Sequence, residues 1–391
     1  MDEPWLSIIG LNEDGPAGLS DASRDALAEA EIVFGGTRHL ALIGAGERGR
    51  SWPVPFDIAE VLVLRGRRIA VLASGDPFWF GVGKVLARAL PRHEWRAFPA
   101  PGTFTLAAAR LGWPLEDTAC LGLHAAPFTR LVPYLAPGWR GICLLRDGKA
   151  VAELAKWLVS RGWGASQLQV MEALGGPRER IRHMTAWQYA PDDIQAPVCV
   201  AIEARGGEGL PRNPGLPEAL FAHDGQITKS PIRAITLAAL APRHDELLWD
   251  LGAGSGSISV EWALAGGHAA AVEQHAGRAA NIRRNAEDFG LDHRIAIHEG
   301  RILECLAGLP APDAIFVGGG FDMAVFEALP RKARLVVNAV TLETGALLAD
   351  LHCRHGGDLL RLDLSHAEPL GPSHSWAPAR PLLQWRLPSC A

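Results

Sequence analysis

A glycine-rich turn and an acid downstream of it carry the clearest chemistry in the second half of the sequence. Residues Leu248–Ser259 read LWDLGAGSGSIS, so glycine recurs at alternate positions where a strand-like run meets a helical one. Glycine lets the backbone approach a ligand closely, and the start of a helix offers unpaired N–H groups. Glu273 ends the next strand-like run, where a carboxylate can accept hydrogen bonds from both hydroxyls of a ribose. We therefore predict a nucleoside-binding site, against the plainer alternatives of a connecting loop and a solvated acid.

The spacing of the turn differs from that of a dinucleotide-binding loop. Ser257 stands where the G-x-G-x-x-G pattern requires its last glycine. Three further glycines, Gly318–Gly320, follow the fourth strand-like run, at the edge where open α/β sheets bind their ligands. They leave two interpretations open: room for a bulky, flat substrate, or a flexible loop.

This half resembles the class I methyltransferases, which bind S-adenosyl-L-methionine (SAM) on a Rossmann-like sheet. The resemblance implies that the glycine turn lies against the methionine part of SAM and that Glu273 holds the ribose. Relatives often carry Gly-Asp-Ala after the third strand, whereas this chain reads Gly300-Arg301-Ile302, so main-chain groups would replace an acidic contact to adenine. The implied cofactor residues are Asp250, Gly252, Ala253, Gly254, Ser255, Gly256, Glu273, Gly300 and Arg301.

A segment upstream of the turn narrows the resemblance. Residues Asp224–Arg233 read DGQITKSPIR and precede an apolar helix, for which Ser230 is the expected N-cap and Pro231 the first residue. Together with NAVTLET at Asn338–Thr344, this segment is similar to the decarboxylating precorrin-6B methyltransferases. That resemblance implies a cofactor contact from Thr228.

A turn in the first half has a local explanation. Residues Ala73–Gly81 read ASGDPFWFG and end a strand-like run. Gly75 supplies conformational freedom, Asp76 is an expected helix cap, and Pro77 is the expected first residue of the helix. These local preferences account for Gly75, Asp76 and Pro77 without requiring that they bind a ligand.

Four segments of the first half nevertheless resemble the tetrapyrrole methylase family. They are IIGL at Ile8–Leu11, the turn at 73–81, PAPGTFT at Pro99–Thr105 and VMEALGGPRERI at Val170–Ile181. The family fold has two α/β lobes with SAM in the cleft between them. The implied cofactor residues are Gly10, Gly75, Asp76, Gly81, Thr103, Phe104, Met171 and Leu174.

The elements that position these residues divide the chain into two α/β domains. Apolar runs alternate with amphipathic stretches in both halves, which is the pattern of β-α units. Seven of the twelve residues from 206 to 217 are Gly or Pro, which predicts a linker. We therefore expect a two-lobed tetrapyrrole methylase fold over residues 1–205 and a Rossmann-like class I fold over residues 218–391.

Each domain is expected to end in strands that do not alternate with helices. Three strand-like runs within residues 168–203 follow one another without a helix, which predicts an antiparallel part of the first domain. In the second domain, residues 359–364 and 382–387 predict a closing strand pair after five β-α units, for seven strands in all.

Composition and charge exclude several classes of protein. The net charge of -5 argues against a protein built to neutralise a nucleic-acid backbone. No apolar run reaches the roughly 18 residues of a membrane span, and the first residues are acidic, unlike a signal peptide. The six cysteines form no C-x-x-C pair, so we expect no metal and reduced thiols in a cytoplasmic protein.

Two unlike methylase patterns on one chain resemble the precorrin-6Y C5,15-methyltransferase (decarboxylating) family over nearly the full length. The resemblance implies one SAM per domain and a corrinoid substrate. Precorrin-6B would be methylated at C5 by the first domain, and methylated at C15 and decarboxylated at its ring-C acetate by the second. The product would be precorrin-8X, an intermediate of cobalamin biosynthesis. A homo-oligomer is also implied, for example a tetramer formed through the C-terminal domain.

The carboxylates of such a substrate require cations. Lys229, Arg233, Arg301 and Arg331 are the substrate-binding candidates, with a solvated surface charge as the alternative for each. The sequence identifies no general acid or base. Two rival functions remain: a tandem methyltransferase acting on RNA or a small heterocycle, and a regulatory protein that only senses SAM.

Overall fold

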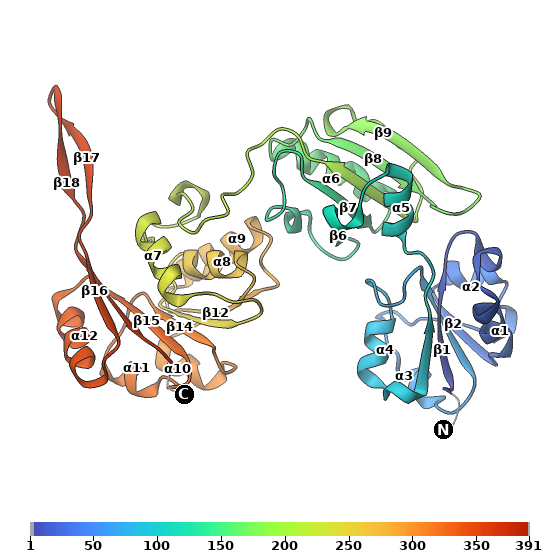
Figure 1. Ribbon diagram of the computed structural model, residues 1–391, viewed down its shortest axis with the longest axis horizontal. Coiled ribbons are helices and arrows are strands. Elements are labelled where there is room, and N and C mark those ends of the chain that lie inside the picture. The colour runs from blue at the N-terminus through green and yellow to red at the C-terminus, as the bar shows by residue number, and fades with distance from the viewer. Residues whose placement is uncertain (1–3, 390–391) are drawn as a thin grey trace. The chain divides into compact units, whose positions relative to one another are not determined.

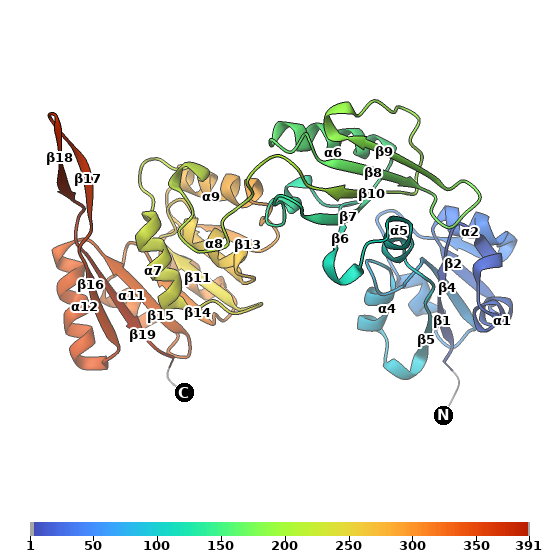
Figure 2. The ribbon, with the colours of Figure 1, turned by 45° about the horizontal axis from the view of Figure 1, so that its top comes forward.

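The structure, a computed structural model, describes residues 4–389. The chain divides into two compact units, each of the α/β class (Figures 1 and 2). The first unit consists of residues 1–128 and 136–208, and the second of residues 129–135 and 209–391.

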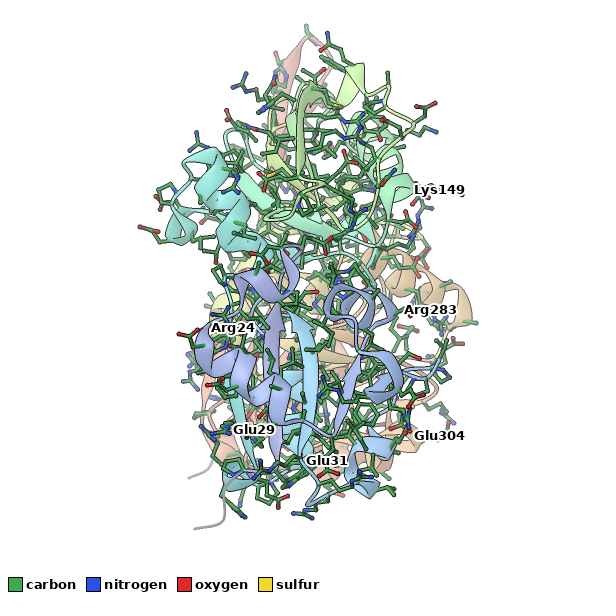
Figure 3. All side chains as sticks on the ribbon, turned by 90° about the vertical axis from the view of Figure 1, so that its right-hand side faces the viewer. Arg24, Glu29, Glu31, Lys149, Arg283 and Glu304 are labelled. Atoms are coloured by element: carbon green, nitrogen blue, oxygen red, sulfur yellow. The ribbon has the colours of Figure 1, made fainter. Side chains whose placement is uncertain are left out.

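The first sheet of the first unit is parallel and buried on both faces. Its elements are β1 (Leu6–Leu11), α1 (Asp21–Glu29), β2 (Ile32–Gly35), α2 (Thr37–Ile43), β3 (Gly49–Ser51), α3 (Ala59–Val63), β4 (Ile69–Ser74), α4 (Gly83–Ala89) and β5 (Trp95–Phe98). The strand order is β3-β2-β4-β1-β5. Because side chains alternate along a strand, Leu6 and Ile8 enter one apolar cluster, and Ile9 and Leu11 enter another on the opposite face. Charged residues such as Arg24 and Glu29 of α1 lie on the surface of this unit (Figure 3).

The predicted helix at Pro77 is wrong, because α4 begins only at Gly83. Asp76 does accept a hydrogen bond from the amide of Phe78, at 2.8 Å, but this closes a turn and caps no helix. Phe80 then adopts a positive φ of 56°, which interrupts any helix there. A loop therefore follows β4.

The second sheet of the first unit is mixed. Its elements are α5 (Thr103–Leu111), β6 (Ala119–Gly122), β7 (Arg140–Leu145), α6 (Gly148–Ser160), β8 (Gln167–Glu172), β9 (Arg180–Thr185) and β10 (Val198–Glu203). The strand order is β6-β7-β10-β8-β9, with β10 antiparallel to both neighbours and β8 antiparallel to β9. The predicted antiparallel end is confirmed. Helix α5 packs on this sheet through Phe104, which joins a cluster with Met171 and Cys199.

The second unit contains the predicted seven-stranded sheet. Its elements are α7 (Ser230–Leu240), β11 (Leu247–Leu251), α8 (Ser257–Leu264), β12 (His268–Glu273), α9 (Ala276–Asp288), β13 (Ile295–Glu299), α10 (Ile302–Cys305), β14 (Ala314–Val317), α11 (Met323–Ala328), β15 (Arg334–Ala339), α12 (Leu342–His355), β16 (Asp358–Leu362), β17 (Ser365–Leu370), β18 (Ser373–Pro378) and β19 (Leu382–Leu387). The order is β13-β12-β11-β14-β15-β19-β16, and β19 runs antiparallel to β15 and β16. Helices α7, α8 and α9 cover one face and α11 and α12 cover the other.

The closing strand pair is confirmed as β16 and β19, with Leu362 opposite Leu382. The chain between them does not turn directly but forms a second hairpin, β17–β18, which projects from the sheet (Figures 1 and 2). This hairpin escaped prediction because nearly all of its side chains are exposed, so no apolar alternation marks its strands.

The end of the predicted linker is packed against the second unit. Leu216 is buried, and the amides of Gly215 and Leu216 donate to the Glu261 carboxylate at 2.6 and 2.9 Å. Ser230 does not cap α7 with its side chain as predicted, because its hydroxyl donates to the carbonyl oxygen of Gly215 at 2.6 Å. These bonds tie the segment to α7 and α8.

Candidate functional site

The second unit has a cavity of about 1200 Å³ at the carboxyl edge of its sheet. Residues that follow β11, β12, β13 and β14 line it, because the ends of parallel strands meet at one edge. Pockets for one small ligand usually measure about 300–1000 Å³. This cavity therefore has room for a flat second molecule beside a nucleoside.

The glycine turn adopts the conformation that the sequence predicts. Gly252, Gly254 and Gly256 have φ values of 68°, 61° and 71°, a region that side chains other than glycine rarely enter. Gly254 faces open space, since a Cβ there would meet no atom closer than 3.9 Å. At Gly256, by contrast, a Cβ would press on Ile282 of α9. Gly254 thus borders the cavity, whereas Gly256 serves packing.

The Glu273 carboxylate is held in place by backbone groups. One oxygen accepts from the amide of Gly254 and the other from the amide of His275, both at 2.9 Å. The side chain lines the cavity at the end of β12. Each carboxylate oxygen can accept a further hydrogen bond, so the geometry suits the two hydroxyls of a ribose.

Two polar atoms beneath the turn have no partner among the described residues. They are Oδ1 of Asp250 and Oγ of Ser255. The other oxygen of Asp250 accepts from the amide and hydroxyl of Ser259, at 3.1 and 2.6 Å. Burial raises the pKa of Asp250 to about 6. Of these two residues only Ser255 lines the cavity, so its hydroxyl is the one available to a ligand with a hydrogen-bonding group, and Asp250 supports the turn from behind.

The structure brings together most of the predicted residues of this half. The cavity is lined by Thr228, Lys229, Gly252, Ala253, Gly254, Ser255, Glu273, Gly300 and Arg301. Asp250 and Gly256 lie behind the turn and do not line the cavity.

Two predicted substrate-binding residues are not at this site. Arg233 is fully buried and pairs with Glu261 at 2.5 Å, while it also donates to the carbonyl oxygen of Leu216. Arg331 precedes β15 and so lies at the opposite edge of the sheet, with its guanidinium carbon 4.1 Å from the ring centroid of Phe326. Both predictions are wrong: Arg233 is buried by partners distant in sequence, and Arg331 precedes a predicted strand, which already indicated the opposite edge of the sheet.

The first unit has a smaller cavity of about 400 Å³. It lies where the loop after β4 meets the second sheet, and the predicted residues that line it are Asp76, Gly81, Thr103, Phe104, Met171 and Leu174. Gly10 and Gly75 do not line it. A Cβ at Gly10 would overlap the carbonyl oxygen of Gly75, so these glycines let β1 and the loop approach each other.

A polar network in the first cavity was not predicted. Glu13 is buried and pairs with Arg38 and with Arg178, the latter at 3.0 Å. Arg38 also donates to Nε2 of His39 at 2.8 Å and to the Ser74 hydroxyl at 3.0 Å. Burial lowers the pKa of His39 to about 4, which keeps the ring neutral and able to accept that bond. The sequence does carry one signal for this network: GGTRH at residues 35–39, which includes Arg38 and His39, directly follows a strand-like run.

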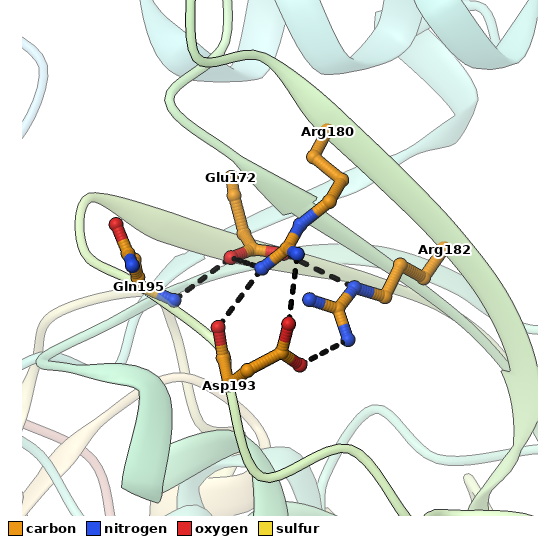
Figure 4. Close-up of polar contacts among 5 residues, drawn as sticks. All are labelled: Glu172, Arg180, Arg182, Asp193 and Gln195. Atoms are coloured by element: carbon orange, nitrogen blue, oxygen red, sulfur yellow. Dashed lines mark hydrogen bonds and ion pairs between the residues drawn. The ribbon is translucent and has the colours of Figure 1, made fainter.

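A second network supports the wall of this cavity (Figure 4). Glu172, which ends β8, is buried and accepts from Arg180 at 2.7 and 2.9 Å and from the amide of Gln195 at 2.8 Å. Asp193 in turn pairs with Arg180 and Arg182 at 2.8 and 2.6 Å. Burial raises the pKa of Glu172, but the hydrogen bonds from Arg180 and the Gln195 amide together with the charges of Arg180 and Arg182 outweigh it, and the net shift is downward. The network anchors the segment that leads to Pro197, a residue of the cavity wall.

Residues 4–389 contain neither a cluster of metal-binding side chains nor a membrane-spanning helix. No group of three or more His, Cys, Asp or Glu side chains is arranged to hold a metal ion. No helix in this range is long and apolar enough to cross a membrane.

Comparison with known families assigns the two parts of the chain separately. Residues 6–189 match the family model of Tetrapyrrole (Corrin/Porphyrin) Methylases. Residues 219–389 match the model of the Precorrin methyltransferase domain.

Two shorter relatives each match less than half of this chain. A cobalt-precorrin-7 C(5)-methyltransferase from Salmonella typhimurium is 30% identical over 188 residues, 45% of this chain and 88% of the relative. A probable cobalt-precorrin-6B C(15)-methyltransferase (decarboxylating) from Pyrobaculum calidifontis is 38% identical over 141 residues, 34% of this chain and 72% of the relative.

One relative matches nearly the whole chain. The precorrin-6Y C(5,15)-methyltransferase (decarboxylating) of Sinorhizobium sp is 46% identical over 396 residues, which cover 98% of this chain and 96% of the relative. Identity at this level along both units places the protein in the family of decarboxylating precorrin-6Y C(5,15)-methyltransferases.

Proposed function

We propose that this enzyme uses SAM to methylate a reduced precorrin-6 (precorrin-6B) at C5 and C15, removes carbon dioxide from the ring-C acetate, and yields precorrin-8X. The observation that carries the proposal is the larger cavity, in which the glycine turn and Glu273 share one space with room for a macrocycle. The division of labour follows the relatives: C15 methylation and decarboxylation belong to the second unit, and C5 methylation to the first.

In the second unit, the residues described above would hold one SAM. Glu273 and the main chain around Gly254 would orient the nucleoside, and Ser255 would meet the amino-acid part, with Asp250 supporting the turn from behind. SAM, when bound, supplies a methyl group on a sulfonium cation that a nucleophilic carbon can take. The chain then has to place the macrocycle in line with that methyl group and exclude water from the space between them.

In the first unit, Asp76, Thr103 and the Met171 region would hold a second SAM. The smaller cavity, about 400 Å³, is within the range of pockets for one small ligand. Arg38 lines this cavity and pairs with Glu13, which Arg178 contacts from outside the lining, so Arg38 is the arginine available to a carboxylated substrate there. A tetramer formed through the second unit stays a prediction.

Product analysis of two variants tests the division of labour. Purified full-length chain is incubated with reduced precorrin-6 and methyl-labelled SAM, and the products are separated by mass spectrometry. Gly254→Arg should fill the second cavity and abolish both C15 methylation and decarboxylation. Asp76→Ala should leave a decarboxylated product with one added methyl group. Decarboxylation by Gly254→Arg at the wild-type rate would overturn the assignment, and calorimetry that counts one SAM per chain would overturn the two-site proposal.

A further inference from the structure

The junction between the seven-stranded sheet and the β17–β18 hairpin forms one wall of the second cavity. Leu362 and Leu382 are the last pair of the β16–β19 ladder, and the amide of Ala379 donates to the carbonyl oxygen of Leu364 at 2.8 Å just beyond it. The start of β19 lies beside the end of β15, where Ala339 is opposite Leu383. The junction is therefore held at the carboxyl edge of the sheet, the same edge as the glycine turn but separated from it by β14 and β15.

Three cationic side chains of this cavity form no ion pair within residues 4–389. They are Lys229, Arg301 and Arg380, all of which line it. Arg380 lies on the junction, between β18 and β19. Arg278 also lines the cavity but differs from these three, since it pairs with Asp224 at 2.8 Å.

The acids of the same cavity are already engaged by backbone groups. Both oxygens of Glu273 accept amide hydrogen bonds, and Asp322 caps α11 by accepting from the amide of Val325 at 2.8 Å. Glu304 accepts from the amide of Arg301 at 3.4 Å. These bonds leave the carboxylates charged, but none of the three acids forms an ion pair with Lys229, Arg301 or Arg380, so those cations are available to pair with an anionic ligand.

The rest of the junction wall is apolar. Leu362, Leu364 and Leu382 line the cavity there, opposite the residues that face the nucleoside. A flat apolar ring with carboxylate arms matches a leucine wall bordered by cations.

We propose that Arg380, on the hairpin junction, binds a carboxylate arm of the corrinoid in the second unit while the leucines beside it contact the macrocycle. Lys229 and Arg301 receive further arms at the same cavity. This inference rests on the proposed function and adds to it a substrate-recognition residue that the glycine-turn motif does not contain.

The test measures KM for reduced precorrin-6 and KM for SAM separately in the full-length chain. A charge-assisted hydrogen bond covered by substrate is worth about a ten- to hundredfold change in affinity. Arg380→Gln should raise KM for the corrinoid by about that factor and leave KM for SAM unchanged. Arg380→Lys, which keeps the charge, should raise KM for the corrinoid by a smaller factor. The matched control is Arg361→Gln, because Arg361 lies on neighbouring β16, pairs with Asp363 at 3.0 Å and does not line the cavity.

The dependence of KM on salt gives a second readout that a structural role would not move. The corrinoid KM of the wild type should rise with ionic strength, and that of Arg380→Gln should rise less steeply. Wild-type turnover with an unchanged corrinoid KM in Arg380→Gln would refute this inference alone, as would an equal rise in both KM values. Failure of the wild type to methylate reduced precorrin-6 would instead refute the proposed function, and this inference with it.

Discussion

Removal of the Arg233 guanidinium should unfold the second unit at a lower temperature without any specific effect on substrate binding. The side chain joins three parts of that unit: it pairs with Glu261 of α8, and it donates to the carbonyl oxygens of Leu216 and Thr228. Its guanidinium carbon also lies 4.9 Å from the ring centroid of Phe221. In Arg233→Met, the Glu261 carboxylate stays buried with only two amide donors.

The expected loss follows from the burial of both partners. The side chains of Arg233 and Glu261 are 0% and 2% exposed, and removal of one member of a buried pair costs about 3–5 kcal/mol. For a unit of this size, each kcal/mol lowers the melting temperature by about 2–4 °C. We therefore expect the second unit's transition to fall by about 6–20 °C in Arg233→Met.

Scanning calorimetry of the full-length chain is the assay. The double variant Arg233→Met, Glu261→Met should recover only part of the loss, because both charges leave the interior together but the amides of Gly215 and Leu216 lose their acceptor. Arg331→Met should change stability by no more than about 0.5 kcal/mol, since that side chain is exposed. An unchanged melting temperature in Arg233→Met together with a raised KM for the corrinoid would refute the reasoning and restore the role that the sequence suggested.

Two further predictions concern the interior of each unit. Asp250 has its pKa raised to about 6 by burial, so the folded chain binds a proton that the unfolded chain releases near pH 4, and stability falls as pH rises from about 4 to about 6. Asp250→Asn should abolish that slope in urea unfolding and stabilise the second unit by up to about 3 kcal/mol at pH 7; an unchanged slope would contradict the assignment. Gly10→Ala forces a Cβ against the backbone of Gly75, which should cost the first unit at least about 1–3 kcal/mol while the second unit's calorimetric transition stays in place. An unchanged first transition would show that this close approach is unimportant, and a shift of both would show that the units do not unfold independently.

Local backbone chemistry explains why much of the fold and of the second site could be predicted. The glycine turn requires positive φ at Gly252 and Gly254, and no distant residue changes that requirement. Glu273 could be placed because it ends a strand next to the strand that carries the turn. Apolar runs predicted the seven strands, because a sheet covered by helices on both faces needs buried side chains along nearly every strand.

Several of the predictions that failed depended on distant partners. Pro77 and Asp76 are sound local signals for a helix start, yet the loop through Phe80 lines the first cavity instead. Arg233 belongs to a segment rich in cofactor residues, and only the position of Glu261, 28 residues further on, turns it into a buried anchor. Gly10 was assigned to the cofactor because it lies in a family motif, whereas its observed role is close packing against Gly75.

The charge of the whole chain is a poor guide to the charge of its sites. A net charge of -5 argues against nucleic acid as the main partner, but it says nothing about one cavity. In the second cavity the acids accept backbone hydrogen bonds, while Lys229, Arg301 and Arg380 form no ion pair with any of residues 4–389. Those three cations lie far apart in sequence, and Arg380 reaches the cavity only because β16 and β19 pair across the intervening hairpin. Recognition of an anionic macrocycle by an acidic protein therefore depends on which charges the fold leaves unpaired, a property that no residue count contains.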